Sequence, residues 1–193
     1  MPEIGQAPLV LLIVFSIVLL LWVATVYPEL MSASFYYLAM LMVSVIVFLL
    51  RSAGLEIPLY FTGLSDEPYE EVVIGVCAGA LMSAPVITGL MVFPPIEEPI
   101  KALFLVLVAP IVEELFFRGF LLATLTEYLG VPLGIFLQAL AFSLFHWAWV
   151  VRIEYLVPFF FFGLVLGYLV SLRGSLDSAI LAHLLYNLIG VIM

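Results

Sequence analysis

Charged side chains are scarce in this 193-residue sequence. Asp, Glu, Lys and Arg make up 10% of it, whereas a soluble domain carries about 25% charged residues. Hydrophobic residues make up 66%, and the mean hydropathy is +1.34. A soluble domain of this size could not bury that much apolar surface, so the composition excludes one and indicates a protein whose solvent is lipid.

Basic residues are the rarest charged group. Five Lys and Arg stand against 14 Asp and Glu, for a net charge of −9. Without a basic patch there is no electrostatic basis for binding nucleic acid, which excludes that class of partner. Most acidic residues lie at the ends of apolar stretches, where we interpret them as ordinary solvated loop residues. Examples are Glu56, Asp66, Glu67, Glu70, Glu71, Glu97 and Glu98.

A single cysteine, Cys77, excludes an internal disulfide, and we interpret it as a small packing residue. No repeat and no linker interrupts the chain, so residues 1–193 are predicted to form one integral membrane domain. The apolar stretch at 7–27 has no basic leader and is too long for a signal-peptide core, so we expect a retained membrane helix.

Apolar runs long enough to cross about 30 Å of hydrocarbon as helices recur along the chain. The predicted fold is therefore an all-α, polytopic transmembrane bundle of about seven spans, with six to eight possible. We expect this bundle to enclose a water-filled cavity. The predicted spans are residues 7–27, 33–50, 72–93, 100–126, 132–150, 156–172 and 176–192. Such a protein has the lipid bilayer as its partner and resides in the cell membrane.

Glycine and proline mark special positions inside these spans. Gly75 with Gly79, and Gly163 with Gly167, are four residues apart, a spacing that lets membrane helices pack closely. Pro110 removes a backbone hydrogen bond one turn before Glu113 and is expected to open that helix locally.

Several ionisable residues lie away from the ends of the spans, where each charge costs about 2.5 to 3.5 kcal/mol even on a lenient scale. They are Glu113, Glu114, Arg118, His146 and His183. Glu114 and Arg118 are four residues apart and can pair on one helix face, whereas Glu113 is turned about 100° away. His183 and Asn187 show the same spacing. Interhelical hydrogen bonding is the structural alternative, but a free carboxylate, two imidazoles and an amide match what amide hydrolysis needs.

Three other routes to proteolysis fit the sequence poorly. Neither histidine belongs to a His-Glu-x-x-His zinc motif. Ser143, one turn before His146, lacks the context of an intramembrane serine nucleophile, and we interpret it as a packing residue. Asp177 is the only aspartate near a span, whereas aspartyl intramembrane proteases need two. A carboxylate and an imidazole acting on water remain.

Three motifs, each in its own apolar span, resemble one known family. Glu113-Glu114-Leu115-Phe116-Phe117-Arg118 resembles the EExxxR motif of the CAAX prenyl protease and bacteriocin-processing family. Phe142-Ser143-Leu144-Phe145-His146 resembles its FxxxH motif, and His183-Leu184-Leu185-Tyr186-Asn187 its HxxxN motif. The motif-bearing part covers about residues 70–193.

The resemblance implies a glutamate-type intramembrane endopeptidase, whose eukaryotic relatives remove the last three residues of prenylated proteins. Glu113 and His146 would activate water, and His183 and Asn187 would form the oxyanion hole. Glu114 and Arg118 would shape the site. The implied substrate is a membrane-anchored or prenylated protein or peptide.

Three alternatives stay open. No cofactor is expected, but Glu113, His146 and His183 could hold a divalent metal and hydrolyse a peptide with its help. The chain could instead be a non-catalytic immunity factor or scaffold. A proton-coupled transporter is a further possibility, although no repeat between halves supports it.

Overall fold

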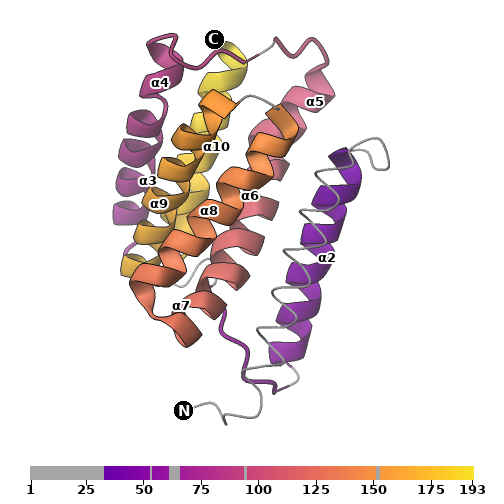
Figure 1. Ribbon diagram of the computed structural model, residues 1–193, viewed down its shortest axis with the longest axis vertical. Coiled ribbons are helices and arrows are strands. Elements are labelled where there is room, and N and C mark those ends of the chain that lie inside the picture. Colours follow the sequence, from indigo (N-terminus) through magenta and orange to yellow (C-terminus); the bar gives the residue numbers. More distant parts are fainter. Residues whose placement is uncertain (1–32, 53, 61–65, 94, 151–152) are drawn as a thin grey trace.

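The computed structural model describes residues 33–52, 54–60, 66–93, 95–150 and 153–193, and every regular element in these ranges is a helix (Figure 1). In chain order they are α2 (Ala33–Ser52), α3 (Pro68–Met82), α4 (Ala84–Ile87), α5 (Pro99–Leu103), η2 (Phe104–Val108), α6 (Ala109–Glu114), η3 (Leu115–Leu122), α7 (Ala123–Leu129), α8 (Val131–Val150), η4 (Ile153–Tyr155), α9 (Leu156–Arg173) and α10 (Asp177–Ile192). The predicted all-helical class is confirmed. The predicted segment 7–27 lies outside the described residues.

Most predicted apolar segments coincide with these helices, and one does not. The segment predicted at 72–93 ends at Ile87 and is broken at Ser83. Pro85 has no N–H to continue the hydrogen-bond ladder of α3. Gly89 then adopts a φ of 73°, a left-handed conformation that favours glycine and ends the helix. The predicted end of this span at residue 93 was therefore wrong, because the helical segment ends at Ile87.

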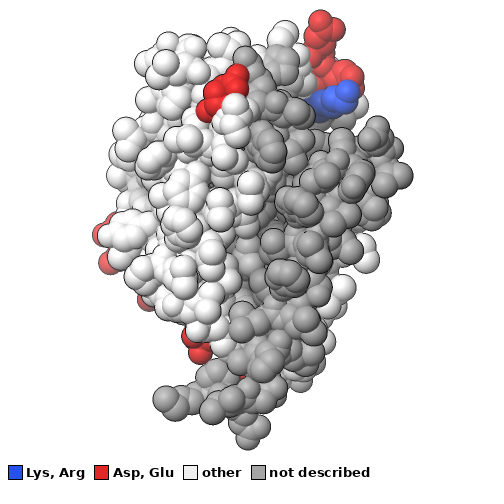
Figure 2. Space-filling model, viewed as in Figure 1, with Lys and Arg blue, Asp and Glu red and all other residues white. Residues whose placement is uncertain are grey.

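Within the part of the chain that the structure describes, two helical segments are long and apolar enough to cross a membrane, Pro68–Ile87 and Ile153–Arg173. Shorter apolar helices are Tyr36–Ser52, Val131–His146 and Asp177–Ile192. On the face in Figure 2, most of the described surface is uncharged, and the few charged side chains lie near its top and along its left edge.

The glycine pairs lie at close helix crossings, as predicted. A Cβ added at Gly79 of α3 would lie 2.7 Å from the carbonyl oxygen of Ala182 in α10. A Cβ at Gly163 of α9 would lie 2.7 Å from the Cα of Ala139 in α8. Because a real Cβ does not approach backbone so closely, these contacts require glycine, and they fix α10 and α8 in the bundle.

Ser143 of α8 also serves packing. It is buried, and its hydroxyl donates a hydrogen bond to the carbonyl oxygen of Leu156 at 2.6 Å. This contact joins α8 to the start of α9, in agreement with the interpretation of Ser143 as a packing residue.

The segment that carries both motif glutamates departs from α-helical geometry on both sides. The π-helical segments η2 and η3 flank α6, which ends at Glu114. Pro110 lies in the first turn of α6, one turn before Glu113. The local opening expected at Pro110 is therefore present as a π-helical turn, a feature that often occurs at functional sites.

Glu71 is an exception among the acidic residues interpreted as solvated. It is buried in α3, and its Oε1 accepts a hydrogen bond from Nε of Arg173 at 2.7 Å. Arg173 lies at the end of α9. Its Nη1 is also 3.2 Å from Oε2 of Glu70, and its Nη2 is 3.7 Å from Oε2 of Glu67. The interpretation was wrong for Glu71 because an ion pair between distant segments leaves no trace in local sequence.

Candidate active site

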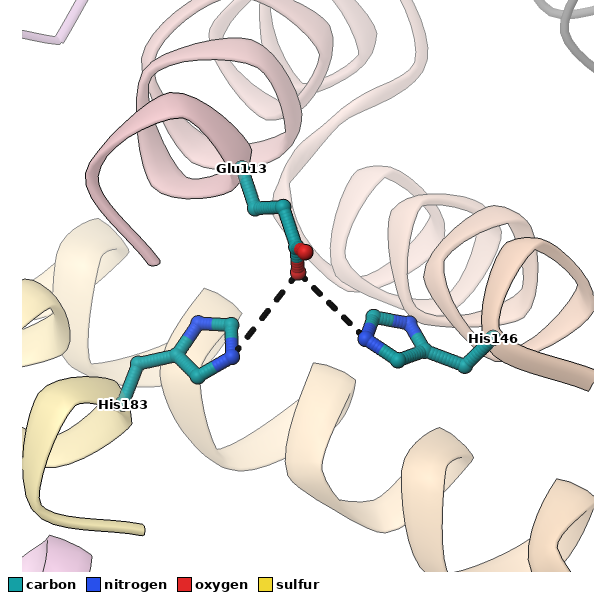
Figure 3. A group of neighbouring side chains, drawn as sticks. All are labelled: Glu113, His146 and His183. Carbon is teal, nitrogen blue, oxygen red and sulfur yellow. Dashed lines mark ion pairs between the residues drawn. The ribbon is translucent and has the colours of Figure 1, made fainter. Parts of the chain in front are cut away.

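Glu113, His146 and His183 come from three different helices and point toward one another (Figure 3). Oε2 of Glu113, on α6, lies 3.3 Å from Nε2 of His146, on α8, and 3.8 Å from Nε2 of His183, on α10. Glu113 and His183 are 2% and 3% exposed. The three motifs are thus brought together at one buried point.

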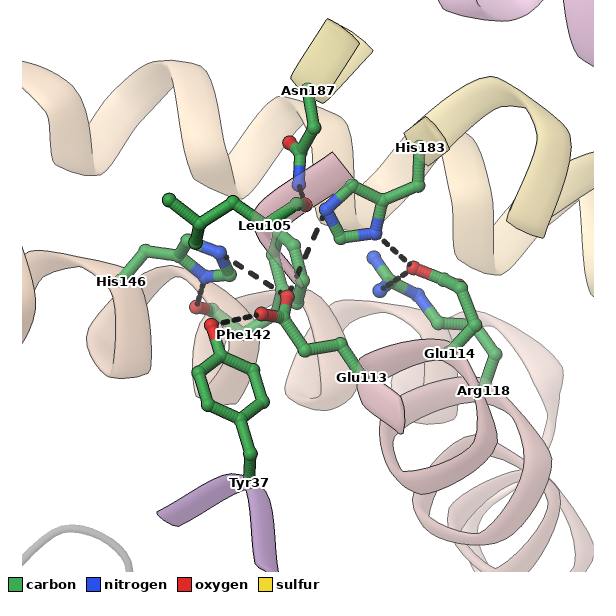
Figure 4. Close-up of polar contacts among 9 residues, drawn as sticks. All are labelled: Tyr37, Leu105, Glu113, Glu114, Arg118, Phe142, His146, His183 and Asn187. Carbon is green, nitrogen blue, oxygen red and sulfur yellow. Dashed lines mark hydrogen bonds and ion pairs between the residues drawn. The ribbon is translucent and has the colours of Figure 1, made fainter. Parts of the chain in front are cut away.

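Glu114 and Arg118 form the predicted pair. Their side chains are fully buried, and Nη1 of Arg118 lies 2.8 Å from Oε1 of Glu114. The guanidinium also lies over the Phe142 ring at 4.1 Å, a favourable cation–π geometry. The same Oε1 of Glu114 lies 2.7 Å from Nδ1 of His183 (Figure 4). Glu114 therefore links the Arg118 charge to one of the two imidazoles.

Hydrogen bonds at Nδ1 orient both imidazole rings. Nδ1 of His146 lies 2.9 Å from the carbonyl oxygen of Phe142, which can only accept, so this nitrogen carries the proton. Nδ1 of His183 lies 2.7 Å from Oε1 of Glu114, an oxygen that is already paired with Arg118, so this nitrogen also acts as the donor. In their neutral forms, both rings direct an unprotonated Nε2 toward Glu113.

Asn187 lies one turn after His183 on α10, and its amide is engaged. Nδ2 donates a hydrogen bond to the carbonyl oxygen of Leu105 at 2.8 Å. In the π-helical turn the N–H of Ala109 reaches back five residues to Phe104. The next N–H in that register would serve Leu105, but residue 110 is proline and has none. Asn187 thus satisfies the carbonyl that Pro110 leaves open.

Sequence reasoning missed Tyr37. Its hydroxyl, on α2, donates a hydrogen bond to Oε1 of Glu113 at 2.9 Å (Figure 4). A tyrosine in an apolar helix is ordinary, and no motif surrounds it. The hydrogen bond joins residues 76 positions apart in the sequence, so only the three-dimensional structure reveals that Tyr37 belongs to the site.

A cavity of about 370 Å³ opens beside these groups. Its polar lining includes Tyr37, Glu113 and Asn187 together with both histidines, and the rest is mainly aromatic and aliphatic. The apolar lining residues are Met82, Phe93, Ile96, Leu105, Phe142, Phe145, Phe159, Phe162, Leu166 and Val191. A few convergent polar groups in an apolar cavity are typical of a binding or active site.

The same three side chains have the donor set of a metal site. One ligand atom from each of Glu113, His146 and His183 lies within 4.8 Å of the others. Ligands of a tetrahedral Zn²⁺ lie about 3.4 Å apart, given Zn–N and Zn–O distances of about 2.0 to 2.2 Å. The 3.3 and 3.8 Å separations around Glu113 Oε2 are compatible with that geometry, and the protonated Nδ1 atoms leave each Nε2 free to bind.

Comparison with known families agrees with the motifs. Residues 94–189 match the family described as type II CAAX prenyl endopeptidase Rce1-like. The matched region contains all three motifs, whereas Tyr37 lies before it. Searches of curated proteins and of solved structures gave no match. By its motifs and by this match, the chain belongs to the type II CAAX prenyl endopeptidase Rce1-like family.

Proposed function

We propose that the protein is a multi-pass intramembrane endopeptidase of the glutamate type, in which Glu113 and His146 activate a water molecule. One observation carries the proposal: a buried carboxylate with an oxygen 3.3 and 3.8 Å from two imidazole nitrogens, at the wall of an apolar cavity. The family makes CAAX-type protease activity the first expectation.

The local charge supports a proton shared in this group. Glu113 and Glu114 contribute two negative charges and Arg118 one positive, so one negative charge remains in a buried site. Burying an uncompensated charge is costly. A proton held between Glu113 and an imidazole removes it, and the same proton is then available to the reaction.

Hydrolysis then proceeds without an acyl-enzyme. Glu113, assisted by Nε2 of His146, takes a proton from water while the water oxygen attacks the scissile carbonyl carbon. The C–N bond breaks as the proton passes from Glu113 to the leaving amine. One water molecule is consumed, and the two products are a peptide with a new carboxyl end and a peptide with a new amino end.

The developing oxyanion needs donors, which His183 and Asn187 supply. With Nδ1 donating to Glu114, His183 would donate from Nε2 as an imidazolium. Asn187 has a second Nδ2 hydrogen beyond the one used by Leu105. Both donors would act in a site poor in water, where each counts for more.

The cavity favours an apolar substrate anchor. Its lining is mainly aromatic and aliphatic, so a prenyl or acyl chain attached to the substrate would gain from burial there. We therefore propose a membrane-anchored or prenylated protein or peptide as substrate, reached from the bilayer of the cell membrane.

The experiment is cleavage of a prenylated peptide ending in a CAAX-type sequence by the purified full chain in lipid vesicles, with products identified by mass spectrometry. The same peptide without the prenyl group is the matched control. Faster cleavage of the prenylated peptide supports the proposal. Binding of the prenylated peptide without cleavage would favour the alternative of a non-catalytic scaffold or immunity factor.

Metal-assisted hydrolysis is the second candidate, because both histidines direct Nε2 toward Glu113. The experiment that separates the two is elemental analysis of the purified protein together with peptide cleavage after chelation. The metal-free mechanism predicts an unchanged rate after chelation. Loss of activity with loss of one ion per chain, and its return with Zn²⁺, would establish the metal mechanism instead.

Substitution of Asn187 separates its two contacts. Asn187→Ala should lower turnover about 10² to 10³-fold, because one oxyanion donor is lost. It should also lower stability by about 1 to 3 kcal/mol, because the Leu105 carbonyl loses its partner. Asn187→Asp should be no better, since a carboxylate cannot donate to that carbonyl.

A second substitution tests the structural half of this explanation. Pro110→Ala returns a backbone N–H that can reach Leu105, so the Asn187→Ala/Pro110→Ala protein should regain thermal stability while turnover stays low. If turnover recovered together with stability, Asn187 would be a structural residue and would leave the proposed oxyanion hole.

A further inference from the structure

We infer that Tyr37 is a positioning residue for the Glu113 carboxylate, although it lies outside the region matched to the family. The inference rests on the proposed function, because it concerns the group that would activate water. It adds α2 to the three helices that already contribute to the site.

The two oxygens of Glu113 have different surroundings. Oε1 accepts a hydrogen bond from the Tyr37 hydroxyl at 2.9 Å, whereas Oε2 faces the imidazoles of His146 and His183 at 3.3 and 3.8 Å. The terminal torsion of a glutamate is broad and nearly two-fold, so the side chain alone does not choose this orientation. The Tyr37 hydroxyl chooses the orientation, because its hydrogen bond to Oε1 keeps Oε2 directed at His146 and His183.

Tyr37 is itself held by neighbours near Glu113. Its ring packs edge-on against Phe104 of η2, with centroids 5.1 Å apart and an interplanar angle of 81°. On either side along α2, Tyr36 and Met40 are buried in the core. Helix α2 contacts α6, which ends at Glu114, and η3, which begins at the next residue. The hydroxyl therefore reaches the carboxylate from a packed ring.

The charge and position of Glu113 explain why this contact matters. A hydrogen bond to an ionised acceptor is roughly twice as strong as a neutral one. When the carboxylate takes a proton from water it becomes neutral, and the hydrogen bond from the Tyr37 hydroxyl becomes weaker. Tyr37 thus acts on the orientation of the Glu113 carboxylate without touching the substrate carbonyl.

Tyr37→Phe isolates the hydroxyl, since the ring and its packing on Phe104 remain. We expect kcat for the prenylated peptide to fall about 10- to 100-fold, as for loss of a hydrogen bond to a charged group, while KM and melting temperature stay near the parental values. Tyr168→Phe removes an exposed hydroxyl from α9 and should leave kcat unchanged. A purely structural role predicts the opposite balance, with a lower melting temperature and a parental kcat.

An infrared measurement tests the contact without any substrate. The spectrum of the parental protein minus that of Glu113→Gln isolates the Glu113 carboxylate bands. The same difference taken in the Tyr37→Phe background should show these bands shifted, because one oxygen has lost its donor. The comparison in the Tyr168→Phe background should show no shift.

The two readouts keep the inference and the proposed function apart. If the parental protein cleaves no peptide, the proposed function fails. A shift of the Glu113 carboxylate bands in Tyr37→Phe would still support the positioning of Glu113 by Tyr37. Unchanged bands, or a parental kcat for Tyr37→Phe in a protein that cleaves the peptide, overturn the inference.

Discussion

Glu113→Gln is expected to lose at least 10² to 10⁴-fold in peptide hydrolysis, the usual contribution of a positioned general base. Glutamine keeps the shape of the side chain and can still accept the Tyr37 hydroxyl through its carbonyl oxygen. It cannot take a proton from water. Folding should therefore be retained while turnover disappears.

The measurement is cleavage of the prenylated peptide by parental and Glu113→Gln proteins in the same vesicles, with melting temperatures recorded in parallel. The inactive variant should also retain the uncleaved peptide, which allows a natural substrate to be captured and identified by mass spectrometry. Cleavage by Glu113→Gln at the parental rate would remove Glu113 from the chemistry.

Arg118→Ala is expected to destabilise the protein by about 3 to 5 kcal/mol, because Glu114 would be left as a buried charge without compensation. Both side chains have no solvent exposure, and they lie 2.8 Å apart. The loss of the contact with the Phe142 ring adds to the cost. Yield, thermal stability and activity should all fall together.

A paired replacement separates stability from activity. Glu114→Leu/Arg118→Met removes both charges with little change in volume, so thermal stability should return toward the parental value. Activity should not return, because His183 loses the carboxylate 2.7 Å from its Nδ1. An Arg118→Ala protein that is fully stable but inactive would instead assign Arg118 to the chemistry.

Hydrophobic runs predicted most of the described helices because nearly all of the residues in these helices are apolar, so segment length and turn residues mark where each helix lies. The helix predicted at 132–150 is α8, and the one predicted at 156–172 is α9. The span predicted at 72–93 ends early, at Ile87, because backbone chemistry overrode hydropathy there. Ser83 and Gly89 interrupt it although the surrounding residues remain apolar.

The motif residues could be found because ionisable groups stand out in an apolar sequence. Spacing alone predicted the pair of Glu114 with Arg118, which helix geometry brings to one face. The contact of Tyr37 with Glu113 could not be predicted, since it depends on how α2 packs on α6. The hydrogen bond from Asn187 to Leu105 was equally hidden, because it requires the π-helical register before Pro110.

Direct attack by water is the central claim, and product analysis in ¹⁸O-labelled water containing hydroxylamine tests it most directly. If Glu113 delivers water to the peptide carbonyl, every new carboxyl end carries one ¹⁸O and no hydroxamate forms. A covalent acyl-enzyme would be intercepted by hydroxylamine, as expected of a side-chain nucleophile. A hydroxamate at the new carboxyl end would therefore contradict the mechanism.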